Sequence, residues 1–408
     1  MSSTGQADPG RPGALRTGAM LASLAFGRLC MGMQLQAIAS LTPFLMADLG
    51  FDYSQIGLLI GLFLAPGVVL GLLGSLIGAR LGYRRLGLFG ALLMAAGSLW
   101  LGFVEGFWAA AGARLVAGTG GILVNIACLR LATELFEGKA MNRAIAVTMS
   151  AWPVGIGLAA VTFAPLAVWS DWRLPLWLLT GVTLLSALWL AFSVGEPARP
   201  ARPRAPLFTL TLDRRSGLLA LLLGAAFACF TAAGVIYLSF APPFFIEAGM
   251  SLTEANATAS MIFWLGLLGT PLGGWLADRR GGTPRVLYLG ILGAALLVVL
   301  VVALIAEPLA PLALTVLLGI VWGLPAAPFT GLLQRMLPLQ AHGAGYGVYF
   351  TLFYCGFFAF PALAGRLTDA TGSPGASLWF ACALLLATAL LVAAFYRAAH
   401  RPASAASA

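Results

Sequence analysis

The chain alternates long apolar stretches with short polar segments from near its start to near its end. Each apolar stretch holds roughly 20 residues, the length of α-helix needed to cross about 30 Å of hydrocarbon. We therefore predict twelve membrane-spanning helices. They cover 18–46, 54–79, 86–105, 107–130, 144–168, 174–194, 216–246, 255–277, 286–306, 309–334, 343–366 and 376–396.

The composition supports a polytopic membrane protein of the all-α class. Hydrophobic residues make up 60% of the 408 residues, and charged residues only 9%. A soluble protein of this size would need far more polar surface to face water. The 50 glycines and 23 prolines would destabilise soluble helices. They are tolerated in membrane bundles, where small residues let helices approach closely.

A proline- and arginine-rich segment, GEPARPARPRAPLFTLTLDRR, lies between the sixth and seventh predicted spans. This composition cannot form a membrane helix and is typical of an extended, solvated linker. Six spans precede it and six follow, so we predict two pseudo-symmetric six-helix bundles. The predicted boundaries are a disordered cytoplasmic leader at 1–17, bundles at 18–195 and 216–396, a basic cytoplasmic linker at 196–215 and a cytoplasmic tail at 397–408.

The distribution of basic residues predicts the orientation in the membrane. With the N-terminus in the cytoplasm, the basic residues of loops and tails fall on the cytoplasmic side, apart from Arg173 and Arg366. This is the pattern of positively charged cytoplasmic loops. The pI of 9.8 therefore reflects topology, and no basic loop interleaved with aromatic residues indicates nucleic-acid binding. We predict a multi-pass protein in the lipid bilayer of a bacterial inner membrane, with both termini cytoplasmic.

Two arginines, Arg28 and Arg114, lie inside long apolar stretches, and no carboxylate occupies a comparable position. A charge at the centre of a bilayer costs about 2.5 to 3.5 kcal/mol on insertion scales, so such residues usually have a function. If both line one water-filled cavity, that cavity attracts an anion, because no acidic partner neutralises them. A guanidinium binds carboxylates and similar planar anions through two parallel hydrogen bonds.

Amide residues on the same helices are candidates to complete this site. Gln36 lies about 80° around the helix from Arg28, and Gln34 is the second amide there. Asn125 follows Arg114 by three helical turns, about 16 Å along one face. Alternatives stay open for these residues. The amides can pack in the core, and Arg28 can extend toward the cytoplasmic surface.

The second half supplies aromatic residues for an opposing wall of the site. Tyr349 and Phe353, four residues apart, are the best candidates, and Tyr237 and Trp264 are further candidates to bind substrate. The alternative is that this aromatic stripe only packs the bundle. The other aromatic residues considered in this half are Trp322, Tyr346 and Tyr354. The prolines that predict broken helices here are Pro242, Pro243, Pro325, Pro328 and Pro361.

Two loops carry a family resemblance. The sequence GWLADRRG at 274–281 has the spacing of the G-x-x-x-D-R-x-G motif of the major facilitator superfamily. Its motif positions are Gly274, Asp278, Arg279 and Gly281. About half a chain earlier, SLIGARLG at 75–82 repeats the motif, with Ser75 in place of the first glycine and Ala79 in place of the aspartate. The family-like residues kept in and after this copy are Arg80, Gly82, Arg84 and Arg85.

A third motif and one looser likeness extend the resemblance over nearly the whole chain. Arg114-x-x-x-Gly118-x-Gly120 is similar to the superfamily's R-x-x-x-G-x-G motif. Arg28 followed by MGMQLQ, together with the acid-less GARLGYRR, resembles the cyanate-permease and nitroimidazole-transporter branch. The resemblance implies alternating access, in which two bundles rock around a central site. In the superfamily the arginine of the third motif is as often structural as substrate-binding, so both roles stay open for Arg114.

The resemblance also implies roles for charged residues near the cytoplasm. Asp278 would hold a closed cytoplasmic gate, with Arg335 as its partner, and Ala79 cannot do the same in the first half. The alternative is that these loops only determine topology. Because no acidic residue lies in the membrane interior, a coupling proton would be carried by Glu134 or Asp278, by a tyrosine, or by the substrate. Uniport and anion exchange are equally open.

We therefore predict a monomeric secondary active or facilitative transporter for a small anionic solute, with no cofactor and no metal. Drug or metabolite efflux is the alternative within the superfamily. The fifth span, however, holds only the fragment Pro153-x-Gly155-x-Gly157 of the exporter signature G-x-x-x-G-P-x-x-G-G. A membrane enzyme is disfavoured, because His342 and His400 fall outside the predicted core and no acidic pair lies within it. A receptor is disfavoured, because it would normally add a soluble output domain and we expect none here.

Overall fold

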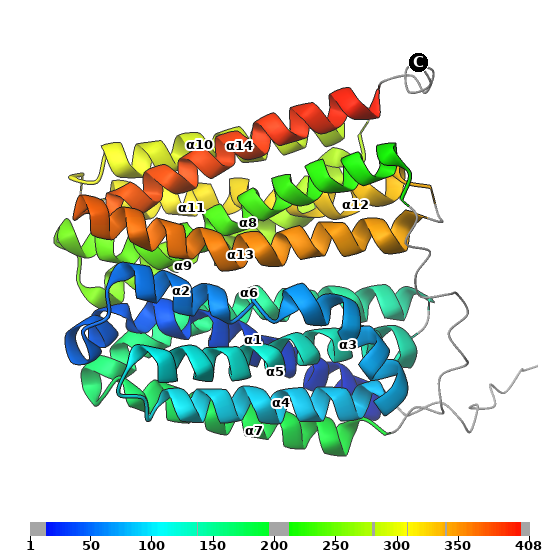
Figure 1. The fold of residues 1–408 in the computed structure, drawn as a ribbon, viewed down its shortest axis with the longest axis horizontal. Helices are drawn as coiled ribbons and strands as arrows, with labels where there is room; N and C mark the ends of the chain where they lie inside the picture. The colour runs from blue at the N-terminus through cyan, green and yellow to red at the C-terminus, as the bar shows by residue number, and fades with distance from the viewer. Residues whose placement is uncertain are drawn as a thin grey trace, which may run out of the picture.

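The computed structural model describes residues 14–136, 138–195, 212–279, 282–307, 309–338 and 341–400. These residues form fourteen α-helices and no β-strand, and the helices of each half of the chain pack into a bundle of their own (Figure 1). The first bundle contains α1 (Ala14–Leu49), α2 (Tyr53–Leu62), α3 (Gly67–Leu81), α4 (Tyr83–Leu101), α5 (Phe107–Leu135), α6 (Gly138–Trp169) and α7 (Arg173–Ser193). The second contains α8 (Arg214–Glu247), α9 (Leu252–Ala277), α10 (Gly282–Ala303), α11 (Ala310–Gly323), α12 (Ala326–Met336), α13 (His342–Thr371) and α14 (Gly375–Ala399).

The predicted spans are present, and two of them are divided. Within the described residues, 11 helical segments are long and apolar enough to cross a membrane. Helix α4, with 19 residues, is not among those 11 and takes the place of the third predicted span. The predicted span 54–79 consists of α2 and α3, and 309–334 consists of α11 and α12. The prediction of an all-helical membrane protein is confirmed.

Prolines predict only part of the breaks in the helices. Pro325 lies between α11 and α12, as expected. Pro242 and Pro243 lie inside the continuous helix α8, and Pro361 lies inside α13, so breaks predicted there are wrong. In a membrane bundle, neighbouring helices can satisfy the carbonyls that proline leaves unpaired. Pro328 is in the first turn of α12, where a missing N–H costs little.

The predicted ends of the leader, linker and tail can be compared with helix ends only within the described residues. Helix α1 begins at Ala14, inside the predicted leader, and residues 1–13 lie outside the described residues. Of the predicted linker, 196–211 also lies outside them, and α8 begins at Arg214. Helix α14 continues to Ala399, and 401–408 is again outside the described residues.

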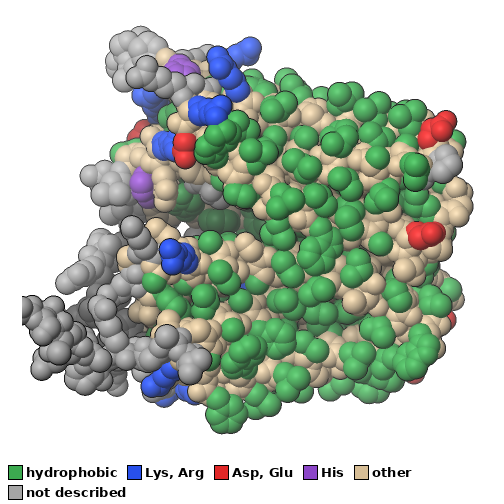
Figure 2. Space-filling model, turned by 180° about the vertical axis from the view of Figure 1, so that it is seen from behind, with side chains coloured by type: hydrophobic (Ala, Val, Ile, Leu, Met, Phe, Trp, Pro, Cys, Tyr) green, Lys and Arg blue, Asp and Glu red, His purple; other side chains and the backbone are tan. Residues whose placement is uncertain are grey.

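The two ends of the molecule carry opposite charge. Arginines gather at one end, called the basic end below, and carboxylates gather at the opposite, acidic end (Figure 2). Helix α1 begins and α14 ends at the basic end (Figure 1). Figure 2 also shows a hollow between the two halves that opens at the basic end.

Candidate functional site

Arg28 on α1 is buried between the helices of the first bundle, with 5% of its surface exposed. Its Nη1 donates to Oδ1 of Asn125 on α5, and its Nη2 lies 3.6 Å from Sδ of Met149 on α6. Its Nε has no hydrogen-bond partner within the described part of the chain. No ion pair joins Arg28 to a carboxylate among the described residues. The guanidinium is thus a buried cation whose protein partners are a neutral amide and a thioether.

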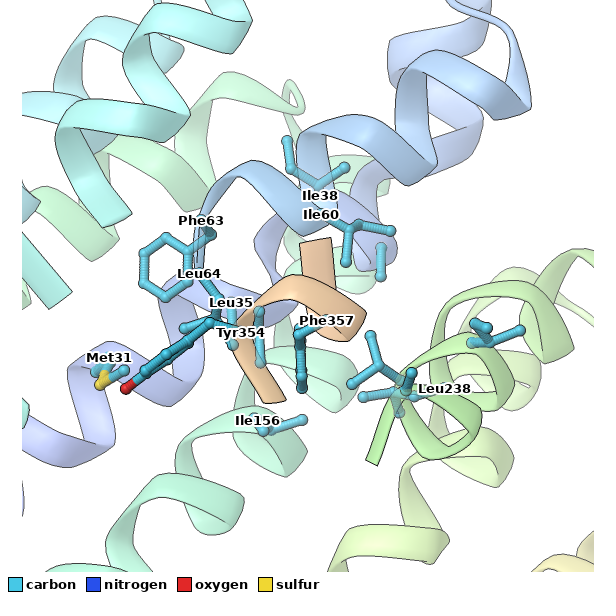
Figure 3. Packing of buried hydrophobic residues seen from close by; sticks show 14 of the residues in the cluster. Met31, Leu35, Ile38, Ile60, Phe63, Leu64, Ile156, Leu238, Tyr354 and Phe357 are labelled. Carbon is cyan, nitrogen blue, oxygen red and sulfur yellow. The ribbon is translucent and has the colours of Figure 1, made fainter. Parts of the chain in front are cut away.

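Tyr354 of α13 brings the second bundle to this arginine. Its side chain lies close to Arg28 and to Asn125. In Figure 3 the hydroxyl points toward Met31 of α1. The ring fits against α3, where a Cβ added at Gly67 would overlap it. We call Arg28, Asn125, Met149 and Tyr354 the Arg28 group, and it includes residues from both halves of the chain.

Arg114 on α5 has a different set of contacts. It is fully buried, its Nε donates to the Leu59 carbonyl of α2 at 3.0 Å, and its Nη1 donates to the Gln34 carbonyl of α1 at 2.8 Å. Its guanidinium carbon also lies 4.6 Å from the centre of the Phe63 ring. Helix α2 ends at Leu62, and the amide of Phe63 donates to Gly61. Arg114 therefore connects three helices of the first bundle next to the break between α2 and α3, and none of these contacts belongs to the Arg28 group.

The two candidate glutamines are buried and bonded elsewhere. The side chain of Gln34 donates to the Met94 carbonyl of α4 at 3.3 Å, and that of Gln36 donates to Ser40 Oγ at 3.2 Å. Their exposed fractions are 1% and 2%. Of the polar residues predicted to line the site in the first half, the structure thus brings together Arg28 and Asn125.

The aromatic candidates of the second half fall into three places. Tyr237 is buried and hydrogen-bonds Thr315 at 2.6 Å. Trp264 of α9 covers Gly157 of α6, where an added Cβ would overlap its indole ring. Tyr349 and Phe353 both stack on Phe227 of α8, at 5.0 and 5.4 Å between ring centres. The Tyr349 hydroxyl is buried, and no residue that the structure describes hydrogen-bonds to it.

At the basic end, the second-half loop forms the ion pair that the resemblance suggested. Arg335 Nη2 lies 3.6 Å from Asp278 Oδ1, and both side chains are mostly exposed. An exposed pair of this kind contributes only about 0 to 1 kcal/mol. Arg279 lies over the Trp275 ring at 3.8 Å. Gly274 is on α9, and a Cβ added at this position would lie 3.6 Å from the Cβ of Ala327 on α12.

The first-half loop at the basic end is built around a glycine turn and a backbone contact of Arg84. Gly82 joins α3 to α4 with a φ of 89°, a conformation that favours glycine. Arg84 Nη2 donates to the Ala191 carbonyl of α7 at 2.7 Å. Arg80, Arg85 and Glu134 are exposed at this end. The predicted motif residue Gly281 lies outside the described residues.

At the acidic end, α2 and α13 join the two bundles by direct backbone contact. A Cβ added at Gly57 or Gly61 of α2 would overlap carbonyl oxygens of α13, and one at Gly365 of α13 would overlap the Tyr53 carbonyl. Asp369 of α13 accepts hydrogen bonds from the backbone amides of Tyr53 and Ser54, at 3.0 and 2.7 Å. It thus caps the N-terminus of a helix in the other bundle, where the helix dipole favours negative charge. The acidic end is closed by these contacts.

The sequence alone does not single out two members of the Arg28 group. Tyr354 is one of several aromatic residues in its half, and Met149 resembles any other apolar residue of its span. A usable signal for Tyr354 existed in α3, because Gly67 and Gly71 leave space on one helix face for a large ring. Nothing in the sequence around Met149 indicated its contact with Arg28.

This combination of fold and site defines the class of protein. Two bundles of apolar helices, packed around a buried cation that both halves contact, are the architecture of a membrane transporter with a central site. The chain belongs to the Major Facilitator Superfamily, whose family model matches residues 24–361. The superfamily predicted from the motifs is therefore confirmed, whereas the cyanate-permease branch stays a prediction. A search of curated protein sequences finds no match.

Solved structures give the same fold. A bacterial homologue of the human lysosomal transporter Spinster, in an inward-facing and unoccupied conformation, is similar with a TM-score of 0.76 and 17% identity, over 95% of this chain and 98% of that chain. A second structure of the same description, in an occupied inward-facing conformation, has a TM-score of 0.72 and 17% identity, over 93% of this chain and 96% of that one. At these identities the likeness concerns the fold alone.

Proposed function

We propose that this transporter moves a small anionic solute across a bacterial inner membrane by alternating access, with Arg28 as the main ligand of the anion. The observation that carries the proposal is the buried guanidinium of Arg28. Among the described residues it is bonded only to Asn125 and Met149, and its Nε has no partner there. Removing such a charge from water is costly unless an opposite charge compensates it. A carboxylate or similar anion would supply that charge together with acceptors for the remaining N–H groups.

Asn125 and Tyr354 suit the same role. Because Oδ1 of Asn125 accepts from Arg28, its amide nitrogen is oriented as a further donor. Tyr354 adds a hydroxyl from the other half of the chain. An anion bound by all three would contact both bundles, so its binding energy would depend on how the bundles are arranged. That dependence is what couples binding to alternating access.

The arrangement of the ends supports an inward-facing state for this structure. Positively charged loops stay in the cytoplasm, which makes the basic end cytoplasmic. The hollow between the halves opens there (Figure 2), and the α2–α13 contacts close the acidic end. The similar structure of the Spinster homologue is itself described as inward-facing. In the outward-facing state, α2 would separate from α13 and the two bundles would approach each other at the basic end. The Asp278–Arg335 pair would then be part of the cytoplasmic gate.

A thermal-shift screen tests the proposal. A ligand that binds only the folded protein raises the free energy of unfolding, by about 2.7 kcal/mol when its concentration is 100 times Kd. The melting temperature rises as a result. We expect small organic and inorganic anions, and not their neutral isosteres, to raise the melting temperature of the purified protein. Neutral compounds that act as well as the anions would contradict the proposal.

A further inference from the structure

The Arg28 group continues directly into a chain of aromatic rings in the second half. Tyr354 lies 5.0 Å from Phe353, measured between ring centres, and Phe353 lies 5.4 Å from Phe227. Phe350, one turn before Tyr354 on α13, lies 6.3 Å from Phe353. We call Phe227, Phe350, Phe353 and Tyr354 the aromatic wall. A buried cation and a set of adjoining rings thus occupy one continuous region.

The geometry of α13 places this wall on the side away from lipid. The exposed residues Cys355, Ala359 and Leu363 recur every four positions and define the outer face of the helix. Counted from Ala359, the middle of these three residues, Phe353 lies about 120° and Phe350 about 180° around the helix. Phe350 lies about 60° from Phe353, on the same inner side of the helix, and its side chain is 41% exposed. Ring surface exposed on this inner face borders the space between the bundles.

The contacts of α13 support this placement. Its rings meet the first bundle through Tyr354 against Gly67 and Gly71 of α3, and Figure 3 shows Tyr354 and Phe357 on the side of the helix that faces Leu35 and Ile156. Phe353 and Phe227 are only half-buried, although both take part in ring stacking. Flat apolar surface is therefore accessible next to the anion-binding atoms.

We propose that the transported anion carries a planar apolar body, as an aryl or conjugated carboxylate does. This inference rests on the proposed anion function of Arg28 and narrows its substrate class. The carboxylate binds Arg28 and Asn125, and the ring packs against Tyr354 and Phe353 of the aromatic wall. Ring stacking adds affinity beyond that of the charge, and binding pockets of this kind combine an apolar lining with a few polar groups that fix orientation.

Three probes separate the inference from the function on which it rests. Benzoate has the charge and the ring, formate has the charge without a ring, and benzamide has the ring without the charge. Binding to the purified full-length protein is measured by calorimetry. We expect benzoate to bind at least about fivefold more tightly than either of the others, since an aromatic contact and a charge-assisted hydrogen bond each contribute affinity of about that size.

A pair of phenylalanine variants locates the ring. Phe353→Leu keeps an apolar side chain and removes the stacking surface, so we expect benzoate to bind about three- to tenfold more weakly and formate to bind as before. Phe192→Leu is the matched control, because Phe192 is 87% exposed at the end of α7 and distant in sequence from every member of the wall.

The outcomes distinguish a failure of the aryl substrate class from a failure of the anion function. Equal affinity for benzoate and formate, or an unchanged benzoate affinity in Phe353→Leu, would overturn the aryl substrate class and leave the anion function intact. Benzamide binding as tightly as benzoate would overturn the anion function itself. Failure of benzoate to bind, in a protein that another anion stabilises, would also overturn the aryl class.

Discussion

Replacing Arg28 by glutamine is expected to reduce anion transport by about 100-fold or more. The substitution removes the charge and about two charge-assisted hydrogen bonds, each worth roughly 1.5 to 3 kcal/mol. The folded protein should be at least as stable as the wild type, because an uncompensated buried cation is lost. The measurement is uptake of a radiolabelled anion into proteoliposomes, together with the melting temperature of the same preparation.

Two further variants make this result specific to the Arg28 group. Arg28→Lys keeps a charge but loses the planar pair of donors, so transport should be partly retained. Arg285→Gln is the matched control, because Arg285 is exposed near the start of α10. It should transport as the wild type does. If Arg28→Gln stays folded and transports normally, Arg28 is not the anion ligand.

Replacing Gly365 by alanine is expected to open the acidic end. A methyl group at this position would overlap the Tyr53 carbonyl of α2, so the helices must separate. Overpacking of a close contact costs about 1 to 3 kcal/mol, which lowers the population of the closed arrangement about 5- to 150-fold. The methyl clash acts only in this arrangement, and the equilibrium therefore moves toward the outward-facing state.

Spin labels across the two halves report this change. In a background in which the exposed Cys355 is replaced by serine, cysteines introduced at Ala47 and Ala370 provide exposed labelling positions at the acidic ends of α1 and α13. Gly365→Ala should lengthen the distance between the labels. Gly181→Ala, whose added Cβ would meet no atom within 4 Å, should leave it unchanged. The same distance distribution in both variants would show that the α2–α13 contact does not hold the acidic end closed.

Hydropathy and charge were sufficient to predict the two bundles, because each span must satisfy its own backbone and be long enough to cross the bilayer. They were not sufficient to predict where the spans break. Pro242 and Pro243 look like a stronger break than Pro66, yet α8 is continuous and α2 ends before Pro66. The difference lies in tertiary contacts, since Arg114 supplies hydrogen bonds next to the broken segment.

The candidate site was predictable to a similar extent. Arg28 and Asn125 were identifiable because polar residues in apolar spans are costly, and the structure places them in direct contact. Gln34 and Gln36 meet the same criterion but bond within their own bundle. Tyr354 and Met149 depend on how α13 packs against α3 and how α6 packs against α1. Sequence periodicity defines the faces of a helix but not its neighbours in space.

The most direct test of the account places a carboxylate where the anion is expected to bind. Met149 Sδ lies 3.6 Å from Nη2 of Arg28, so Met149→Glu would provide a built-in counter-ion of suitable reach. Met149→Gln is the matched neutral control. We predict that anion binding, measured by calorimetry, falls about 100-fold in Met149→Glu and stays close to the wild-type value in Met149→Gln, while both proteins remain folded. Equal anion affinity in the two variants would contradict the assignment of the anion to Arg28.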